Sequence, residues 1–342
     1  MGIDELLRVV AALLPVLLFL LGLRLLDSFK LVPMRMVAGA LVAGAAAAAV
    51  CYGFNSFIFA HFPGHEETYA HFGAPVVEEM AKAVYWVVLI ATARVAFMVD
   101  SAICGFAIGA GFALLENISY LQVLEGRSLM LWLLRGLGTA VMHGGVAAIG
   151  ALIPVYLSES RQWRGAGRFV PGLLVAMMLH SLFNQGVLSP ASSTVAVIVA
   201  LPLIFGVVFY FSEQSLRRWM TGKLDEDIEL LAMIASGEFN NTPQGAYLMS
   251  LNEAFPPEVR GDMLTLLHLT IELSARAKGD LMQREAGLEI PPDPALERDF
   301  KELRYLEKSI GPTGMLAVRP LLKQTPRDLW QIHHLTRNVT DS

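Results

Sequence analysis

The chain has 342 residues, of which 54% are hydrophobic and 17% are charged, and its mean hydropathy is +0.51. Ordinary soluble domains carry about 25% charged residues, so this composition excludes a typical soluble protein and predicts a membrane protein. The net charge of −5 lacks the basic excess of nucleic-acid-binding proteins, and we expect no nucleic acid among its partners. The two cysteines, Cys51 and Cys104, lie inside apolar stretches, which predicts neither a disulfide framework nor a thiolate metal site.

The first part of the chain consists of long apolar stretches. A helix needs about 20 mostly apolar residues to cross a hydrocarbon core of ~30 Å, and about seven stretches meet this requirement. They are residues 6–26, 36–60, 72–94, 99–121, 129–157, 168–189 and 191–212. From residue 213 onward the segments become charged, with helical periodicity. We therefore predict an all-α protein, with a polytopic transmembrane bundle at 1–212 and a soluble helical domain at 213–342.

The loops between these stretches predict an orientation in the lipid bilayer, because short cytoplasmic loops are enriched in Lys and Arg. Basic residues such as Arg24, Arg94 and Arg217 fall in loops on one side, whereas the other side carries Arg8 and Arg127. We expect the N-terminus outside the membrane and the C-terminal domain in the cytoplasm. The lack of a disulfide framework is compatible with a bacterial plasma (inner) membrane.

Ionisable side chains inside a membrane span are functional candidates, because a charge near the bilayer centre costs roughly 2.5–3.5 kcal/mol on insertion scales. The third to sixth spans carry several such residues, together with amides. They are Glu78, Glu79 and Lys82 in PVVEEMAKA, Glu116 and Asn117 in GFALLEN, His143 in VMHGG, and His180 and Asn184 in MLHSLFN. Glu78 and Lys82 are four residues apart, so they share one helix face and Lys82 can act as a counter-ion for Glu78. Arg135, near the outer end of its span, is expected to snorkel to the membrane interface.

The depth of these residues indicates that they can meet. With a rise of about 1.5 Å per residue, Glu79, Glu116, His180 and Asn184 fall within a band of ~6 Å in the outer half of the membrane. His143 lies somewhat deeper and approaches the same band. We therefore expect four helices to close around one polar site.

Carboxylates, imidazoles and a buried cation are the groups needed to activate a water molecule. A glutamate can act as general base, and His and Asn side chains can donate to a developing oxyanion. The same residues could instead hold Zn²⁺ through His143, His180 and Glu116, with water in the open position. The sequence leaves both chemistries open. A proton- or ion-coupled transporter is the alternative function, because buried Glu and His chains also form proton relays.

The polar motifs resemble those of a known family. E-E-x-x-K (Glu78, Glu79, Lys82), F-x-x-x-E-N (Phe112, Glu116, Asn117), an isolated intramembrane His143 and H-x-x-x-N (His180, Asn184) look like the motif series of the PrsW family of intramembrane proteases. That family is distantly similar to the CAAX-prenyl endoprotease and bacteriocin-processing superfamily, whose second motif has His where Glu116 stands here. The resemblance covers about residues 70–190.

The resemblance implies a membrane-embedded peptidase that cleaves a single-span regulatory protein, similar to an anti-sigma factor, on the outer side of the membrane. Its catalysis would depend on a metal ion or on glutamate. We expect the catalytic residues to be Glu78, Glu79, Glu116, His143 and His180. We expect their supporting or oxyanion-binding residues to be Lys82, Phe112, Asn117 and Asn184.

Overall fold

The computed structural model describes residues 3–29, 31–124, 127–160, 163, 165–288, 293–322, 325, 327–328, 330–331 and 335. These residues form helices and connecting turns, with no strand among them, which confirms the all-α prediction for the described chain. The chain divides into two compact units, Met1–Glu213 and Gln214–Ser342.

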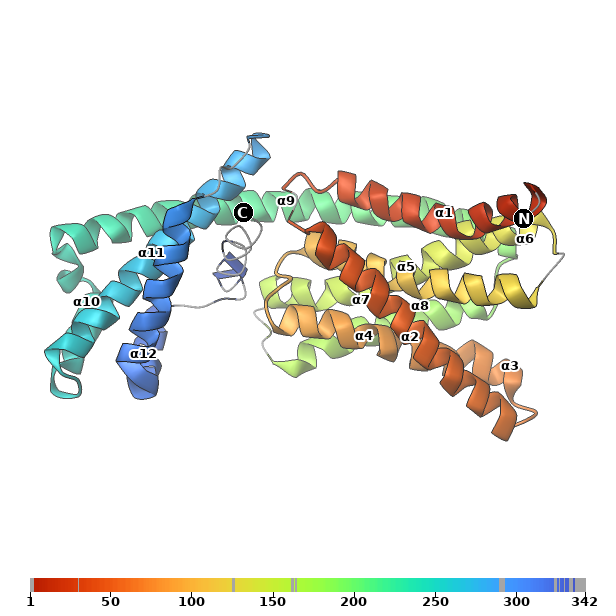
Figure 1. The fold of residues 1–342 in the computed structure, drawn as a ribbon, viewed down its shortest axis with the longest axis horizontal. Coiled ribbons are helices and arrows are strands. Elements are labelled where there is room, and N and C mark those ends of the chain that lie inside the picture. Colours follow the sequence, from red (N-terminus) through yellow and green to blue (C-terminus); the bar gives the residue numbers. More distant parts are fainter. Residues whose placement is uncertain are drawn as a thin grey trace. The chain divides into compact units, whose positions relative to one another are not determined.

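The first unit contains the long apolar helices (Figure 1). Its N-terminal half comprises α1 (Ile3–Leu25), α2 (Met34–His61), α3 (Glu66–Thr68), the π-helical turn η1 (Tyr69–Gly73) and α4 (Ala74–Ala91). Its C-terminal half comprises α5 (Met98–Val123), α6 (Leu129–Leu134), the π-helical turn η2 (Arg135–Thr139), α7 (Ala140–Ser160), the 3₁₀ turn η3 (Ala166–Arg168), α8 (Phe169–Asn184) and the beginning of α9 (Pro190–Ser236).

Within the described residues, six helical segments are long and apolar enough to cross a membrane, so the protein is a multi-pass membrane protein. They are Ile3–Leu25, Met34–His61, Met98–Val123, Leu129–Glu159, Ala166–Asn184 and Pro190–Ser236. The predicted span 72–94 is helical as α4, but it is not among the six. Its 18 residues include three charged ones, Glu78, Glu79 and Lys82, so its composition alone does not identify it as a span. The count of seven spans stays a prediction.

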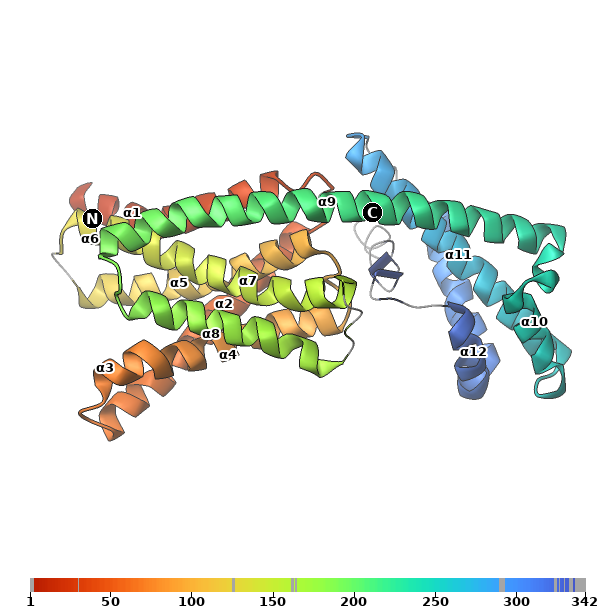
Figure 2. The ribbon, with the colours of Figure 1, turned by 180° about the vertical axis from the view of Figure 1, so that it is seen from behind.

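Helix α5 forms the centre of the first unit, and every residue from Met98 to Ala113 is buried. Glycines let its neighbours approach closely. A Cβ atom at Gly109 would lie 2.1 Å from the carbonyl oxygen of His143 in α7, and one at Gly111 would lie 2.0 Å from that of Leu41 in α2. Small residues allow this backbone contact between membrane helices. Helices α5 and α7 accordingly lie side by side in both views (Figures 1 and 2).

The second unit consists of the end of α9, the 3₁₀ turns η4 (Glu238–Asn241) and η5 (Leu251–Glu253), and the helices α10 (Pro243–Ser250), α11 (Pro257–Glu285) and α12 (Pro294–Leu322). It has its own apolar core, which includes Met263 and Leu266 of α11 and Phe300 of α12. Beside this core, the buried Lys278 donates hydrogen bonds to Asp227 at 2.5 Å and to Ser274 at 2.7 Å. Its placement in the cytoplasm stays a prediction.

Candidate active site

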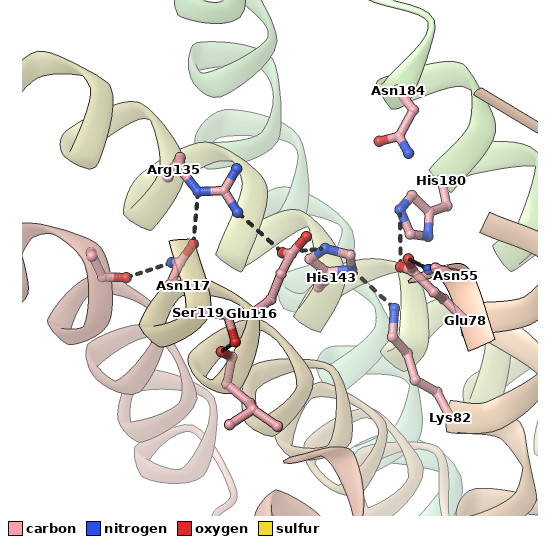
Figure 3. A network of polar contacts seen from close by, with 12 residues as sticks. Asn55, Glu78, Lys82, Glu116, Asn117, Ser119, Arg135, His143, His180 and Asn184 are labelled. Atoms are coloured by element: carbon pink, nitrogen blue, oxygen red, sulfur yellow. Dashed lines mark hydrogen bonds and ion pairs between the residues drawn. The ribbon is translucent and has the colours of Figure 1, made fainter. Parts of the chain in front are cut away.

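The polar residues of α4, α5, α7 and α8 lie together in one network of contacts (Figure 3). Lys82 stands at its centre, with a side chain that is 0% exposed. Its Nζ atom donates to Oε1 of Glu79 at 2.7 Å and to Nδ1 of His143 at 2.9 Å. The ammonium group also lies 4.1 Å from the ring centroid of Phe112. This one cation therefore links three helices.

The ion pair of Lys82 differs from the one that the sequence suggested. The spacing of four residues predicted Glu78 as the partner, but the structure pairs Lys82 with Glu79, three residues before it. Positions three and four apart both lie on one helix face, so spacing did not distinguish them. The counter-ion prediction is thus corrected from Glu78 to Glu79.

His180 lies between the two adjacent glutamates. Its Nδ1 atom is 2.8 Å from Oε1 of Glu79, and its Nε2 atom is 3.8 Å from Oε2 of Glu78. A carboxylate on one ring nitrogen fixes the ring and directs the other nitrogen toward a ligand. Glu79 is therefore engaged by two partners, whereas Glu78, at 12% exposure, is the more accessible carboxylate.

His143 has a contact at each ring nitrogen. Lys82 is a hydrogen-bond donor without acceptor capacity, so Nδ1 of His143 accepts and the proton of a neutral ring is on Nε2. This Nε2 atom lies 3.3 Å from Oε2 of Glu116. The same carboxylate oxygen lies 3.3 Å from Nη2 of Arg135. Glu116 is thus placed between a ring N–H group and a guanidinium.

Arg135 does not snorkel to the interface as the sequence suggested, and its side chain is 17% exposed. Besides pairing with Glu116, it donates from Nε to Oδ1 of Asn117 at 2.9 Å and lies 3.9 Å from the ring centroid of Tyr120. Three partners on α5 compensate its burial. Asn117 in turn donates to the carbonyl oxygen of Ala12 in α1 at 2.8 Å, and it supports the network from outside.

Asn184 lies at the edge of the network and holds the backbone of η1. Its Nδ2 atom donates to the carbonyl oxygen of Ala70 at 3.1 Å. Two residues that we did not single out from the sequence lie on this side, Asn55 in α2 and Tyr69 in η1. Asn55 donates to Oε1 of Glu78 at 3.4 Å and accepts from the hydroxyl of Tyr69 at 2.7 Å. An amide inside an apolar stretch was the signal that could have identified Asn55.

Three side chains of the network can hold a metal ion. Glu78, His143 and His180 each offer a ligand atom, and these atoms lie within 4.8 Å of one another. Two imidazoles and one carboxylate form the protein ligand set of hydrolytic zinc sites, and Glu79 supplies the outer contact such a histidine needs. The residues present therefore fit a zinc ion.

This group differs in one member from the metal-ligand set expected from the sequence. Glu116 was the expected carboxylate, but it faces His143 and Arg135, and Glu78 is the carboxylate in the group of three. Because both nitrogens of His143 have contacts, metal binding by His143 requires the release of either Lys82 or Glu116.

Comparison with known proteins finds a matching family. A family model described as PrsW family intramembrane metalloprotease matches residues 32–211, which is more than half of the chain. The matched region extends from the start of α2 into α9 and contains all the site residues named above except Ala12. No curated protein and no solved structure matches the chain.

Proposed function

The chain belongs to the PrsW family of intramembrane metalloproteases, and on this basis we propose that it hydrolyses a peptide bond in a single-span membrane protein. The observation that carries the proposal is the grouping of Glu78, His143 and His180, whose ligand atoms lie within 4.8 Å of one another. These residues would hold a zinc ion, which when bound supplies an activated water and polarises the scissile carbonyl.

The remaining charged residues have separate tasks in this proposal. Glu79 keeps the ring of His180 in place, and Lys82 balances the charge of Glu79 inside the bundle. Glu116 is 26% exposed and lies beside His143, so it is the carboxylate available to take a proton from the attacking water and return it to the leaving amine. Arg135 holds Glu116 in place for this transfer.

The proposed substrate is a regulatory protein with one membrane span, similar to an anti-sigma factor, cut near the outer surface of a bacterial plasma membrane. The position of the site supports this. Glu78 follows η1 by five residues, and η1 lies just after the connection that follows α2, which an N-terminus outside the membrane also puts on the outer side. Glu78 therefore lies within about two helical turns of the end of η1. We place residues 213–342 in the cytoplasm, which is across the membrane from the N-terminus.

The test uses the purified full chain in vesicles with a panel of single-span membrane proteins. We expect the wild-type chain to cut a substrate into discrete fragments of defined size, and we expect no fragments with Glu78→Gln or Glu116→Gln. If no protein in the panel is cut and the vesicles instead build a solute gradient that an uncoupler collapses, the peptidase proposal is wrong and the transporter alternative gains support.

A further inference from the structure

Glu78 has weaker contacts than its neighbour Glu79. Glu79 is 2% exposed and is bonded by both Lys82 and His180 at 2.8 Å or less. Glu78 is 12% exposed, and its Oε2 atom lies 3.8 Å from His180. Its Oε1 atom accepts a hydrogen bond from Nδ2 of Asn55 at 3.4 Å. The direction of the Glu78 carboxylate therefore depends on Asn55.

The amide of Asn55 has two different ends, and Glu78 and Tyr69 each bind one of them. An amide oxygen accepts hydrogen bonds, whereas the nitrogen donates them. Oδ1 of Asn55 accepts from the hydroxyl of Tyr69 at 2.7 Å, and Nδ2 is directed to the carboxylate. With the amide rotated by half a turn, the Asn55 oxygen and the Glu78 carboxylate, which are both acceptors, would face each other without a proton between them. The Glu78 carboxylate, which only accepts, thus favours this orientation, and the Tyr69 hydroxyl holds the other end of the amide in place.

Tyr69 is itself held by the turn η1. Its ring packs edge to face against Phe59 of α2, with the ring centroids 5.5 Å apart. A Cβ atom at Gly73 would lie 2.3 Å from this ring, so glycine is needed there. The carbonyl oxygen of Ala70 accepts a hydrogen bond from Asn184 of α8. The hydroxyl of Tyr69 is therefore presented by a turn that α2 and α8 hold from two sides.

From these contacts we propose that Asn55 is a positioning residue for the Glu78 carboxylate, and that Tyr69 acts through Asn55. The inference rests on the proposed function, which assigns Glu78 to the zinc group. Contacts outside a ligand shell typically change metal affinity or activity by about 10- to 100-fold. We expect a loss in this range for Asn55→Leu, which keeps the size of the side chain and removes both hydrogen bonds, and a smaller loss for Tyr69→Phe.

The experiment uses the full chain in detergent with Zn²⁺ alone as the first probe. Zinc affinity is measured by competition with a coloured chelator, and kcat and KM are measured with a single-span protein that the wild-type chain cleaves. Asn55→Leu should weaken zinc binding and lower kcat, while KM stays unchanged. The double variant Asn55→Leu/Tyr69→Phe should equal Asn55→Leu, because Tyr69 acts through the residue already replaced.

The matched control for Tyr69→Phe is Tyr52→Phe. It also removes a tyrosine hydroxyl, but from a side chain on α2 that is 67% exposed. It should match the wild-type chain in both readouts. If Asn55→Leu and Tyr69→Phe also match an active wild-type chain, the inference is overturned and the proposed function stands. Additive losses in the double variant would overturn the assignment of Tyr69. A wild-type chain that neither binds zinc nor cleaves any substrate refutes the proposed function, and the inference fails with it.

Discussion

The Nζ atom of Lys82 lies 2.9 Å from Nδ1 of His143, and this contact joins two groups of polar residues (Figure 3). On the α4 side, Lys82 is bonded to Glu79, which holds His180. On the α7 side, His143 faces Glu116, which is paired with Arg135. The two groups therefore form one charged network, and a change at one end should be measurable at the other.

Replacing Lys82 with Met should destabilise the protein strongly, because it leaves the buried Glu79 carboxylate without its cation. Breaking a buried pair by removing one partner typically costs about 3–5 kcal/mol. The double variant Glu79→Gln/Lys82→Met has no uncompensated charge and should recover much of the loss, without recovering activity. Thermal unfolding in detergent measures both effects.

The control for that variant is Lys223→Met. Lys223 and Glu226 form an ion pair at the same spacing of three residues, but their side chains are 46% and 65% exposed. Exposed pairs contribute little to stability, so this change should leave the unfolding temperature almost unaltered. Equal shifts for Lys82→Met and Lys223→Met would contradict the central place of Lys82.

The metal group predicts which carboxylate binds zinc. Glu78→Gln should remove stoichiometric zinc from the purified chain, because Glu78 belongs to the group of three with His143 and His180. Glu116→Gln should keep the zinc and lose peptidase activity. Elemental analysis after dialysis against a metal-free buffer measures the zinc content. Loss of zinc from Glu116→Gln but not from Glu78→Gln would reverse the assignment.

Arg135→Lys should reduce kcat about tenfold or more, because Arg135 holds the proposed general base Glu116 and a positioned acid or base typically contributes about 10²- to 10⁴-fold. A lysine keeps the charge, but it lacks the planar group with which Arg135 pairs with Glu116, bonds Asn117 and stacks on Tyr120. Steady-state cleavage of a membrane-protein substrate gives kcat and KM. Arg127→Lys, at an exposed position in the preceding loop, is the control. Wild-type kcat in Arg135→Lys would show that Glu116 does not need this partner.

Gly109→Ala should displace His143, because the added methyl group would lie 2.1 Å from the His143 carbonyl oxygen. Forcing extra atoms into a packed core typically costs 1–3 kcal/mol, so we expect a loss of about 1–3 kcal/mol in unfolding free energy together with lower zinc affinity. Gly206→Ala is the matched control, since its added methyl group would meet no neighbouring atom within 4 Å. Indistinguishable unfolding and zinc binding in the two variants would argue against the close approach of α5 and α7.

Much of the architecture could be predicted from the sequence, because long apolar stretches in a membrane protein have few structural solutions. Six of the predicted spans coincide with long apolar helices. The depth estimate also brought Glu79, Glu116 and His180 to one level, since it needs only the helical rise. The predicted span 72–94 is not among these six, because it contains the charged residues that the site uses.

The partners within the site could not be derived in the same way. Insertion cost identifies Glu78 and Lys82 as charges inside a span, but it says nothing about side-chain direction. Lys82 bonds Glu79 because the two lie on one face, where helical spacing allows two choices. Arg135 turns inward because α5 offers it a carboxylate, an amide and an aromatic ring. Asn55 was overlooked because no Asp, Glu, Lys, Arg or His stands within four residues of it, whereas Asn117 stands beside Glu116 and Asn184 stands four residues after His180.

The turns η1 and η2 determine the direction in which the side chains of the site point. Each stands directly before a helix with reactive groups, α4 with Glu78 or α7 with His143, and a π-helical turn contains one residue more than an α-helical one. A single residue rotates an α-helix by about 100°, so deleting one residue from either turn would swing the following side chains out of the network. Two extra residues, one in each turn, thus fix the rotation of α4 and α7 about their axes, while they hardly change the length or the hydrophobicity of these segments.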